Sequence, residues 1–281
     1  MSATGGVAAG QDVARLRQIG MNLVALFTTL FRRPRPAAVR PAWPPFRRLA
    51  LGTAVGLMVV AAAMIFLDGR LIGEAQRLPP WVIRTSNEIT DFGKSGWFLF
   101  PIGFMLIGIA ALATSELPRL TRLVLAAIAV RLGFVFVAIA VPGLFVAILK
   151  RVIGRARPLV GEDGFVYMPF VWRADYASIP SGHGTTAFAA AVAIGALWPR
   201  ARLIIWTYAL LIAASRVVVT AHFPSDVIAS VFCGVIGALL VRNWFAVRRL
   251  GFAVTPDGAV RTLPGPSLRR LKGVARSLFA Q

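Results

Sequence analysis

Six long apolar stretches constrain this chain more than any other feature of its sequence. Each is free or nearly free of charged residues; 57% of all residues are hydrophobic, and the mean hydropathy is +0.73. About 20 apolar residues in a helix cross the roughly 30 Å hydrocarbon core of a membrane, because each residue adds about 1.5 Å. The sequence therefore predicts an all-α integral membrane protein with six transmembrane helices. The predicted spans are residues 49–67, 97–114, 123–149, 182–198, 203–219 and 227–241.

The basic residues indicate how these helices are oriented. The chain has 31 Lys and Arg against 11 Asp and Glu, a formal net charge of +20. With six spans both termini lie on one side, and that side holds twenty basic residues against ten on the other. Because basic residues favour the cytoplasmic side, we expect both termini in the cytoplasm and the opposite face outward. In a bacterium this describes a multi-pass protein of the inner membrane with its outward face in the periplasm.

This topology divides the chain into three parts. Residues 1–48 form a basic cytoplasmic arm, residues 49–245 the six-helix membrane domain, and residues 246–281 a basic cytoplasmic tail. The basic residues do not form one patch, so they indicate topology and affinity for anionic lipid, and no nucleic acid partner is expected. The arm has no short apolar core followed by a small-residue cleavage site, so the first span is expected to direct insertion.

Four segments outside the spans have weaker patterns. Residues 13–31 suit either a helix on the membrane surface or a short disordered lead. Residues 34–45 are too rich in proline to be helical. We expect residues 68–96 to form an exposed loop with a short helix, and residues 268–278 a short surface helix.

Two single residues within the apolar stretches also bear on the fold. Arg131 lies inside the third predicted span, so either its side chain snorkels to the near surface or the crossing begins at Leu132. The sole cysteine, Cys233, lies in the sixth span. A single cysteine excludes an intrachain disulfide and a cysteine metal cluster.

Residues 215–226 interrupt the apolar sequence with polar and charged groups. Pro224 is expected to end one helix and Ser225 to cap the next, which places His222 and Asp226 at a helix-loop-helix junction. A carboxylate that holds one nitrogen of an imidazole fixes its tautomer and makes the other nitrogen a better nucleophile. The alternative is that the pair merely lies on an exposed loop.

Three basic residues lie near the same predicted face. Arg216 adds a permanent cation beside the histidine, unless it snorkels to the membrane surface. Lys150 and Arg157, the latter followed by Pro158, lie at the outward end of the third span. Basic residues at a helix end are also ordinary membrane anchors, so this pair alone does not indicate a site.

A third cluster, Pro180-Ser181-Gly182-His183, begins the fourth predicted span. A small Ser-Gly pair at a helix start leaves backbone N–H groups and the positive end of the helix dipole free, which suits a phosphate. Ser181 can cap the helix or bind an oxyanion, and His183 is the other of the chain's two histidines. The topology brings all three clusters to one face. Together they supply the cations, amides, nucleophile and acid that phosphoryl transfer needs.

With these residues the sequence resembles the type 2 phosphatidic acid phosphatase superfamily, which includes lipid phosphate phosphatases. The family pattern is Lys, six residues, Arg-Pro; then Pro-Ser-Gly-His; then Ser-Arg, five residues, His, three residues and Asp. The resemblance covers residues 150–226 for the motifs and about 49–245 for the spans. The matching positions are Lys150, Arg157, Pro158, Pro180, Ser181, Gly182, His183, Ser215, Arg216, His222 and Asp226.

The resemblance implies a phosphatase that needs no metal and no other cofactor. It implies that His222, oriented by Asp226, attacks phosphorus to form a phosphohistidine. It also implies that His183 protonates the departing lipid oxygen and then activates the water that releases phosphate. The site would lie at the outward ends of helices 3 to 6. The implied phosphate ligands are Lys150, Arg157, Ser181, the Gly182 amide and Arg216.

The implied substrate is a phosphorylated lipid of the surrounding bilayer. Family substrates are undecaprenyl diphosphate, phosphatidylglycerol phosphate, phosphatidic acid and lipid A 1-phosphate, and we rank the first two ahead. We expect the loops at 68–96 and 159–179 to choose among them. The side chains expected to reach a second phosphate are those of Arg77, Arg84, Lys94 and Arg173. The alternatives are a transporter, which would place its charges near the midplane, and a catalytically inactive lipid binder.

Overall fold

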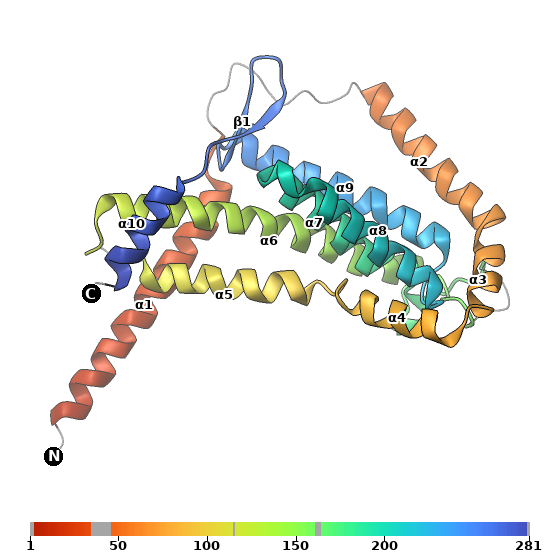
Figure 1. The fold of residues 1–281 in the computed structure, drawn as a ribbon, viewed down its shortest axis with the longest axis horizontal. Helices are drawn as coiled ribbons and strands as arrows, with labels where there is room; N and C mark the ends of the chain where they lie inside the picture. Colours follow the sequence, from red (N-terminus) through yellow and green to blue (C-terminus); the bar gives the residue numbers. More distant parts are fainter. Residues whose placement is uncertain (1–2, 35–45, 115, 161–163, 280–281) are drawn as a thin grey trace. The chain divides into compact units, whose positions relative to one another are not determined.

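A computed structural model describes residues 3–34, 46–114, 116–160 and 164–279, and this part of the chain is α-helical apart from one small β-ribbon (Figure 1). The all-α class is therefore confirmed. Of the proline-rich segment, residues 35–45 lie outside the described residues. The elements are α1 (Ala3–Phe31), α2 (Phe46–Phe66), α3 (Asp68–Gln76), α4 (Pro80–Asp91), α5 (Gly96–Leu112), α6 (Arg119–Ile153), α7 (Gly182–Leu197), α8 (Arg202–Val218), α9 (Pro224–Val247), β1 (Phe252–Val254), β2 (Val260–Thr262) and α10 (Leu268–Phe279).

Four stretches are long and apolar enough to cross a membrane. They are Pro80–Leu112, Arg119–Ile153, Pro199–Val218 and Pro224–Val247. A fifth is present if α2 and α3, which are bent by 49° relative to each other, form one broken span. The remaining predicted span coincides with α7, which is apolar but has 16 residues. The chain is thus a multi-pass membrane protein with four to five candidate spans.

Two expectations about local structure are wrong. Pro224 does not end a helix: α8 ends at Val218 and Pro224 is the first residue of α9. Proline suits this position because the first helical N–H has no intrahelical acceptor and the ring fixes a helical φ. Residues 68–96 are not mainly a loop. They form α3, α4 and the start of α5, and they bury polar side chains, including those of Asp68 and Thr90.

Two other local features place the segments that follow α6 and precede α7. Ser181 is the N-cap of α7, as predicted, and its hydroxyl accepts a hydrogen bond from the Gly184 N–H. Gly154 follows the last residue of α6 with a φ of +66°. A side chain there would lie 1.8 Å from the Met168 carbonyl oxygen, so only glycine fits this turn. The turn directs the next residue, Arg155, into the protein interior, where its side chain is fully buried.

The chain divides into two compact units. The motif unit contains residues 43–99 and 137–242, and the terminal unit contains residues 1–42, 100–136 and 243–281. Every residue of the three predicted motifs belongs to the motif unit.

The terminal unit is held together by long-range polar contacts as well as apolar packing. The Asn22 amide of α1 donates to the carbonyls of Ala110 and Ala113, where α5 ends. Arg131 donates to the carbonyls of Leu263 and Pro264, so its guanidinium is bound by the chain's own C-terminal segment. These contacts give the Arg131 guanidinium protein partners, and they are compatible with both sequence-based interpretations of where the membrane crossing begins.

Helices are present at both ends of the chain: α1 covers residues 13–31, for which a surface helix and a disordered lead were the alternatives, and α10 covers the helix expected at 268–278. The helix α10 packs its apolar side on the ends of α5 and α6, in a cluster that includes Val274, Leu117 and Val124. Its arginines and its lysine lie on the opposite, polar side, which is the arrangement of an amphipathic helix.

In the motif unit, α7 packs closely along α8, and α7, α8 and α9 run side by side (Figure 1). The contact surface is made of small and branched residues, among them Ala187, Ala209 and Ile212. Small residues let membrane helices approach closely, since their backbones can then touch. A Cβ at Gly234 of α9 would lie 2.7 Å from the Thr185 carbonyl oxygen of α7, so this crossing depends on glycine.

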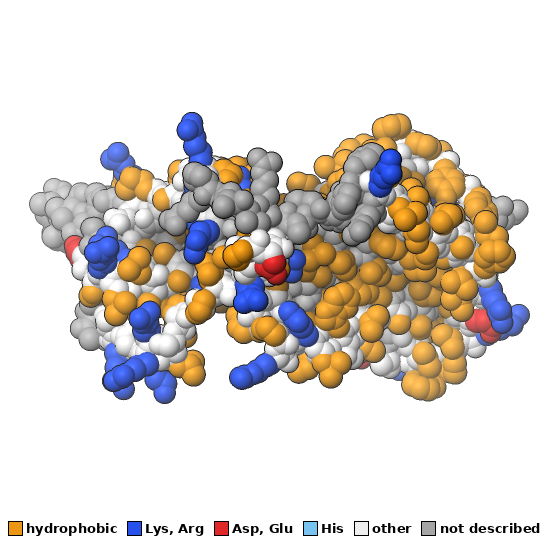
Figure 2. Space-filling view, turned by 90° about the horizontal axis from the view of Figure 1, so that it is seen from above, with side chains coloured by type: hydrophobic (Ala, Val, Ile, Leu, Met, Phe, Trp, Pro, Cys, Tyr) orange, Lys and Arg blue, Asp and Glu red, His pale blue; other side chains and the backbone are white. Residues whose placement is uncertain are grey.

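The outer surface of the protein is strongly apolar. Side chains such as Phe104, Leu203 and Ile204 are more than two-thirds exposed. Figure 2 shows that hydrophobic side chains cover most of the surface on the right of the view, whereas Lys and Arg side chains are more frequent on the left and along the lower edge. Such an expanse is typical of a surface in contact with lipid chains.

We predict that Gly234→Ala destabilises the protein by about 1–3 kcal/mol, because the added methyl group must separate α9 from α7. Thermal unfolding of the purified protein in detergent measures this effect. Gly108→Ala in α5 is the matched control, since no described atom lies within 4 Å of the added carbon. Equal unfolding temperatures for the two variants would contradict the described α7–α9 contact.

Candidate active site

The predicted motif residues come from the ends of four helices in the motif unit. Lys150 lies in the last turn of α6 and His183 in the first turn of α7. Arg216 lies in the last turn of α8 and Asp226 in the first turn of α9. His222 lies in the turn that joins α8 to α9. The three motifs are therefore brought together at neighbouring helix ends.

Backbone contacts fix these helix ends to one another. The Ser181 N–H donates to the Asp226 carbonyl at 3.1 Å, and the His222 N–H donates to the Arg216 carbonyl at 3.2 Å. A Cβ at Gly182 would lie 3.9 Å from Nζ of Lys150, so the ammonium group lies beside the start of α7. The positive end of the α7 dipole and the Lys150 charge thus favour an anion in the same place.

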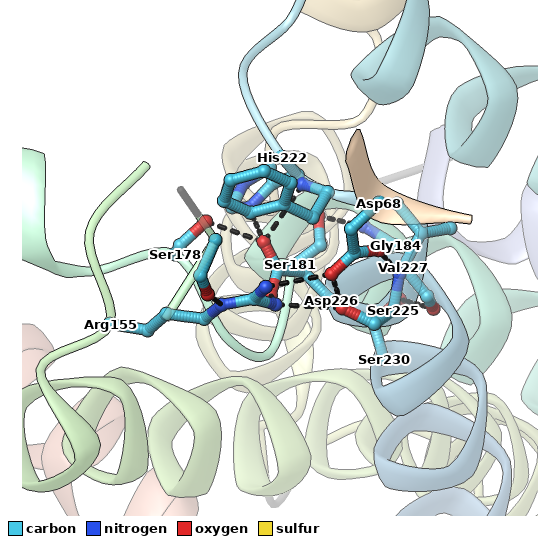
Figure 3. Close-up of polar contacts among 12 residues, drawn as sticks. Asp68, Arg155, Ser178, Ser181, Gly184, His222, Ser225, Asp226, Val227 and Ser230 are labelled. Carbon is cyan, nitrogen blue, oxygen red and sulfur yellow. Dashed lines mark hydrogen bonds and ion pairs between the residues drawn. The ribbon is translucent and has the colours of Figure 1, made fainter. Parts of the chain in front are cut away.

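His222 and Asp226 form the predicted pair, but not as a direct hydrogen bond. Nδ1 of His222 lies 3.7 Å from Oδ2 of Asp226, beyond hydrogen-bond range. The same carboxylate is fixed by other donors: the Ser178 hydroxyl, the Phe223 N–H at 2.9 Å and Nη1 of Arg155 at 2.6 Å. Figure 3 shows the imidazole next to this carboxylate, with Arg155 on the other side. The carboxylate orientation is thus set independently of the histidine.

The environment of His222 keeps its imidazole neutral. Burial lowers its pKa from 6.5 to about 4, and the opposing attraction of Asp226 does not compensate. At neutral pH the ring therefore has an unprotonated nitrogen, which is the form that acts as a nucleophile.

Two arginines present buried donors that remain unpaired. Nε of Arg157 and Nε of Arg216 are buried and have no hydrogen-bond partner among the described residues. Nη1 of Arg216 donates to the Thr90 hydroxyl at 2.8 Å, which fixes that guanidinium against α4. Burial lowers the pKa of Arg157, and the carboxylates of Asp175 and Asp226 oppose this shift. Unpaired buried donors are costly, and they are expected where a ligand supplies the acceptor.

A cavity of about 520 Å³ adjoins these groups. Its polar end is formed by Lys94, Lys150, Gly182 and His183. The apolar part of its wall comes from α5 and α6; it includes Leu99, Ile139, Gly143, Leu144, Val146 and Ala147. The cavity can therefore hold a molecule with an anionic group at one end and an aliphatic part at the other.

Four contributors to the site were missed by sequence reasoning. Thr90 binds Arg216, Gly93 lies against His183, and Asp68 and Arg155 form buried contacts with the α9 N-terminus. A Cβ at Gly93 would lie 2.9 Å from Cδ2 of His183. Arg155 precedes Arg157 by two residues, so its proximity to the motif was visible. The other three lie far away in sequence, and no spacing pattern connects them with the motifs.

Of the four basic side chains expected to reach a second phosphate, Lys94 lines the cavity. Lys94 also pairs with Asp91, as Arg77 does with Glu74 and Arg173 with Asp175, all in exposed ion pairs. Within the described ranges, no group of three His, Cys, Asp or Glu side chains is placed to hold a metal ion.

Two histidines and three cations lie at helix ends of the motif unit, beside a cavity of about 520 Å³, and this arrangement suits phosphoryl transfer. The PAP2 superfamily matches residues 131–250 of the chain. A lipid A 1-phosphatase of Rhizobium johnstonii is 34% identical over 238 residues, which are 83% of this chain and 95% of that protein. A lipid A 1-phosphatase of Rhizobium etli is 35% identical over 219 residues, 76% of this chain and 92% of that protein.

Two crystal structures are also similar to this chain. Aquifex aeolicus LpxE is 22% identical with a TM-score of 0.47, covering 63% of this chain and 96% of that one. The first transmembrane PAP2 type phosphatidylglycerolphosphate phosphatase from Bacillus subtilis is 19% identical with a TM-score of 0.43, covering 81% and 95%.

The chain belongs to the PAP2 superfamily, which confirms the resemblance found in its motifs. It is a membrane lipid phosphate phosphatase, of a family of metal-independent phosphoester hydrolases.

The lowered pKa of His222 predicts how stability depends on pH. The unfolded chain protonates this histidine near pH 6.5, whereas the folded protein does so near pH 4. Between these values the unfolded state binds more protons, so the free energy of unfolding decreases as the pH falls from about 6.5 to about 4. Unfolding temperatures of the wild type should therefore fall more steeply over this range than those of His222→Asn. Parallel curves would show that His222 is not buried in its neutral form.

Proposed function

We propose that this protein removes phosphate from a lipid of the lipid A 1-phosphate class. The observation that carries this choice is the similarity to two lipid A 1-phosphatases, since the chain spans almost their full length at 34% and 35% identity. The sequence motifs alone ranked undecaprenyl diphosphate and phosphatidylglycerol phosphate ahead. The relatives reverse that order, because the motifs encode the reaction whereas identity outside them also reflects the substrate.

In the proposed mechanism His222 is the nucleophile. Its neutral imidazole attacks phosphorus, the bond from phosphorus to the lipid oxygen breaks, and His183, protonated in the complex with the anionic substrate, donates its proton to that oxygen. As the ring becomes cationic, the nearby Asp226 carboxylate stabilises it. His183, now unprotonated, takes a proton from water, which attacks the phosphohistidine and releases phosphate.

Five groups are proposed to bind the phosphoryl oxygens. The unpaired Nε groups of Arg157 and Arg216 supply buried donors, and Lys150 supplies a third cation beside the start of α7. Ser181 accepts the Gly184 N–H as a helix cap, which leaves its own hydroxyl hydrogen free to donate. The Gly182 amide is the fifth group. Each well-placed donor contributes on the order of 2–4 kcal/mol to the transition state.

The cavity supports a lipid as the substrate. Its cationic end lies beside His183 and its apolar wall follows α5 and α6, so the phosphate of a lipid can reach the histidines while a chain lies along these helices. Because the helices are exposed to the bilayer, such a substrate can enter sideways and need not leave the membrane.

We further propose the topology that the charges predict. The membrane domain, residues 49–245, crosses six times, with α2–α3 as a broken span and α7 as a short one. The basic segments 1–48 and 246–281 lie in the cytoplasm, and the site faces the periplasm of a bacterial inner membrane.

The mechanism predicts different defects for the two histidine variants. His222→Ala should lose essentially all phosphate release, because no phosphoenzyme can form. His183→Ala should still form a phosphoenzyme from a substrate with a good leaving group, such as a nitrophenyl phosphate, but release phosphate slowly. The assay measures free phosphate and acid-trapped phosphoenzyme from purified protein in detergent with a chelator present. Wild-type rates for His222→Ala would refute the nucleophile assignment, and loss of wild-type activity on chelation would refute metal independence.

The substrate proposal predicts the order of activity in a lipid panel. The value of kcat/KM should be highest for lipid A 1-phosphate, compared with undecaprenyl diphosphate, phosphatidylglycerol phosphate and phosphatidic acid.

Lys94→Gln should raise the KM for substrates with a second anionic group by about tenfold, the effect of one lost charge-assisted hydrogen bond. Arg77→Gln, which removes an exposed ion-paired cation, is the control. An equal preference for phosphatidic acid, or an unchanged KM in Lys94→Gln, would contradict this assignment.

A further inference from the structure

Arg155 is buried completely at the centre of the motif unit, although the catalytic motifs do not include it. Its guanidinium lies between two carboxylates: Nη1 donates to Asp226 at 2.6 Å and Nη2 donates to Asp68 at 2.7 Å. Nε donates to the Gly164 carbonyl at 2.9 Å, and the Phe223 ring lies 4.3 Å below the guanidinium. These contacts leave Arg155 essentially one possible position (Figure 3).

Asp68 is the second part of this arrangement. It lies 87 residues before Arg155, at the start of α3, and its exposed fraction is 2%. One oxygen accepts from Arg155 and from the Ser225 hydroxyl, and the other accepts from the Ser225 N–H at 2.9 Å. Asp68 therefore caps the first turn of α9, the role that the sequence had suggested for Ser225 itself. This is the turn that contains Asp226.

The charges of the three groups do not cancel. The single guanidinium of Arg155 balances only one of the two carboxylates, so the cluster has a net charge of −1 next to His222. If Asp68 were absent, Arg155 would neutralise Asp226, and the imidazole would face a cluster without net charge. Asp68 thus keeps a negative charge available where a positive charge develops on the histidine.

The geometry also separates the two oxygens of Asp226. Oδ1 is bound by Arg155, whereas Oδ2 faces His222 and accepts from Ser178 and the Phe223 N–H. With Oδ1 fixed, the carboxylate cannot rotate its second oxygen away from the imidazole.

We propose that Asp68 and Arg155 are positioning residues for phosphoryl transfer, which hold the Asp226 carboxylate and the first turn of α9 in place against His222. The proposal rests on the function proposed for His222. Neither residue is proposed to contact the substrate; both act through Asp226.

Two charge-conserving or shape-conserving variants test this role. Asp68→Asn keeps the shape but removes the charge, and Arg155→Lys keeps the charge but cannot bridge two carboxylates. Both should lower kcat by about 10- to 100-fold, the usual range for partners that orient a functional group, and leave KM within about twofold. The rate of phosphoenzyme formation, measured by rapid quench, should fall by the same factor as kcat.

The matched controls are Glu74→Gln and Arg70→Lys. They make the same kinds of chemical change at exposed positions of α3, the helix that contains Asp68. Both should retain wild-type kcat and KM. If Asp68→Asn or Arg155→Lys is folded and keeps its kcat within about twofold, or loses affinity for substrate instead, the positioning role is refuted.

If neither Asp68→Asn nor Arg155→Lys folds, Ser225→Ala tests the positioning role instead. It removes a hydroxyl that contacts both Asp68 and Arg155 but leaves no buried charge unpaired. It should lower kcat about fivefold at an unchanged KM, as expected for one hydrogen bond, and an unchanged kcat would overturn the proposal. Absence of phosphatase activity in the wild type and in the Glu74→Gln control would instead refute the proposed function itself.

Discussion

The motif unit depends on the need to pair a charge that has no access to water. Arg155 is fully buried, and Asp68 and Asp226 meet it at 2.7 and 2.6 Å. Removing one partner of such a pair typically costs about 3–5 kcal/mol, because the remaining charge stays buried. The pairing therefore requires three segments to be in register at once: the bend where α2 becomes α3, the turn after α6 and the first turn of α9. These three segments surround His222, so the condition for folding the unit is also the condition for assembling its site.

The other two arginines of the site differ from Arg155 because their guanidinium groups are only partly hydrogen-bonded. Arg157 and Arg216 each retain a buried Nε without a partner in the described part of the chain, whereas Nε, Nη1 and Nη2 of Arg155 each donate to an acceptor. An unsatisfied buried donor costs about 1–3 kcal/mol, which is a large fraction of the stability of a folded protein. Among the described residues, Nε of Arg242 and Nε of Arg248 are also buried and unpaired, so an open donor alone does not identify an anion site. Arg157 and Arg216 differ from those two because they belong to the motifs that are proposed to bind phosphate, whereas Arg155 is paired with two carboxylates.

Sequence reasoning identified the helices and the motifs for a simple physical reason. Apolar runs specify helices locally, and residues such as His183 and Asp226 lie at helix starts that serine, glycine and proline mark. Sequence reasoning did not predict contacts between segments that are distant along the chain. The Asp68–Arg155 pair spans 87 residues, and the Thr90–Arg216 hydrogen bond spans 126. The carbonyl partners of Arg131 were missed for the same reason, since they lie in the C-terminal segment. The reversed role of Pro224 was a local error: a proline before a polar residue begins a helix as readily as it ends one.

The segment from α3 to the start of α5 contributes side chains to the site that are not part of its motifs. It lies outside the region that matches the PAP2 superfamily, residues 131–250, yet it supplies Asp68 to α9, Thr90 to Arg216, and Lys94 to the cavity. The motifs provide groups that any phosphate monoester requires, and these groups cannot distinguish one lipid from another. A segment that contacts the motif residues from outside can change the wall of the cavity without changing the chemistry. Under the proposed function, differences in substrate among proteins with identical motifs should therefore be sought first in this segment, which both contacts motif residues and lines the cavity.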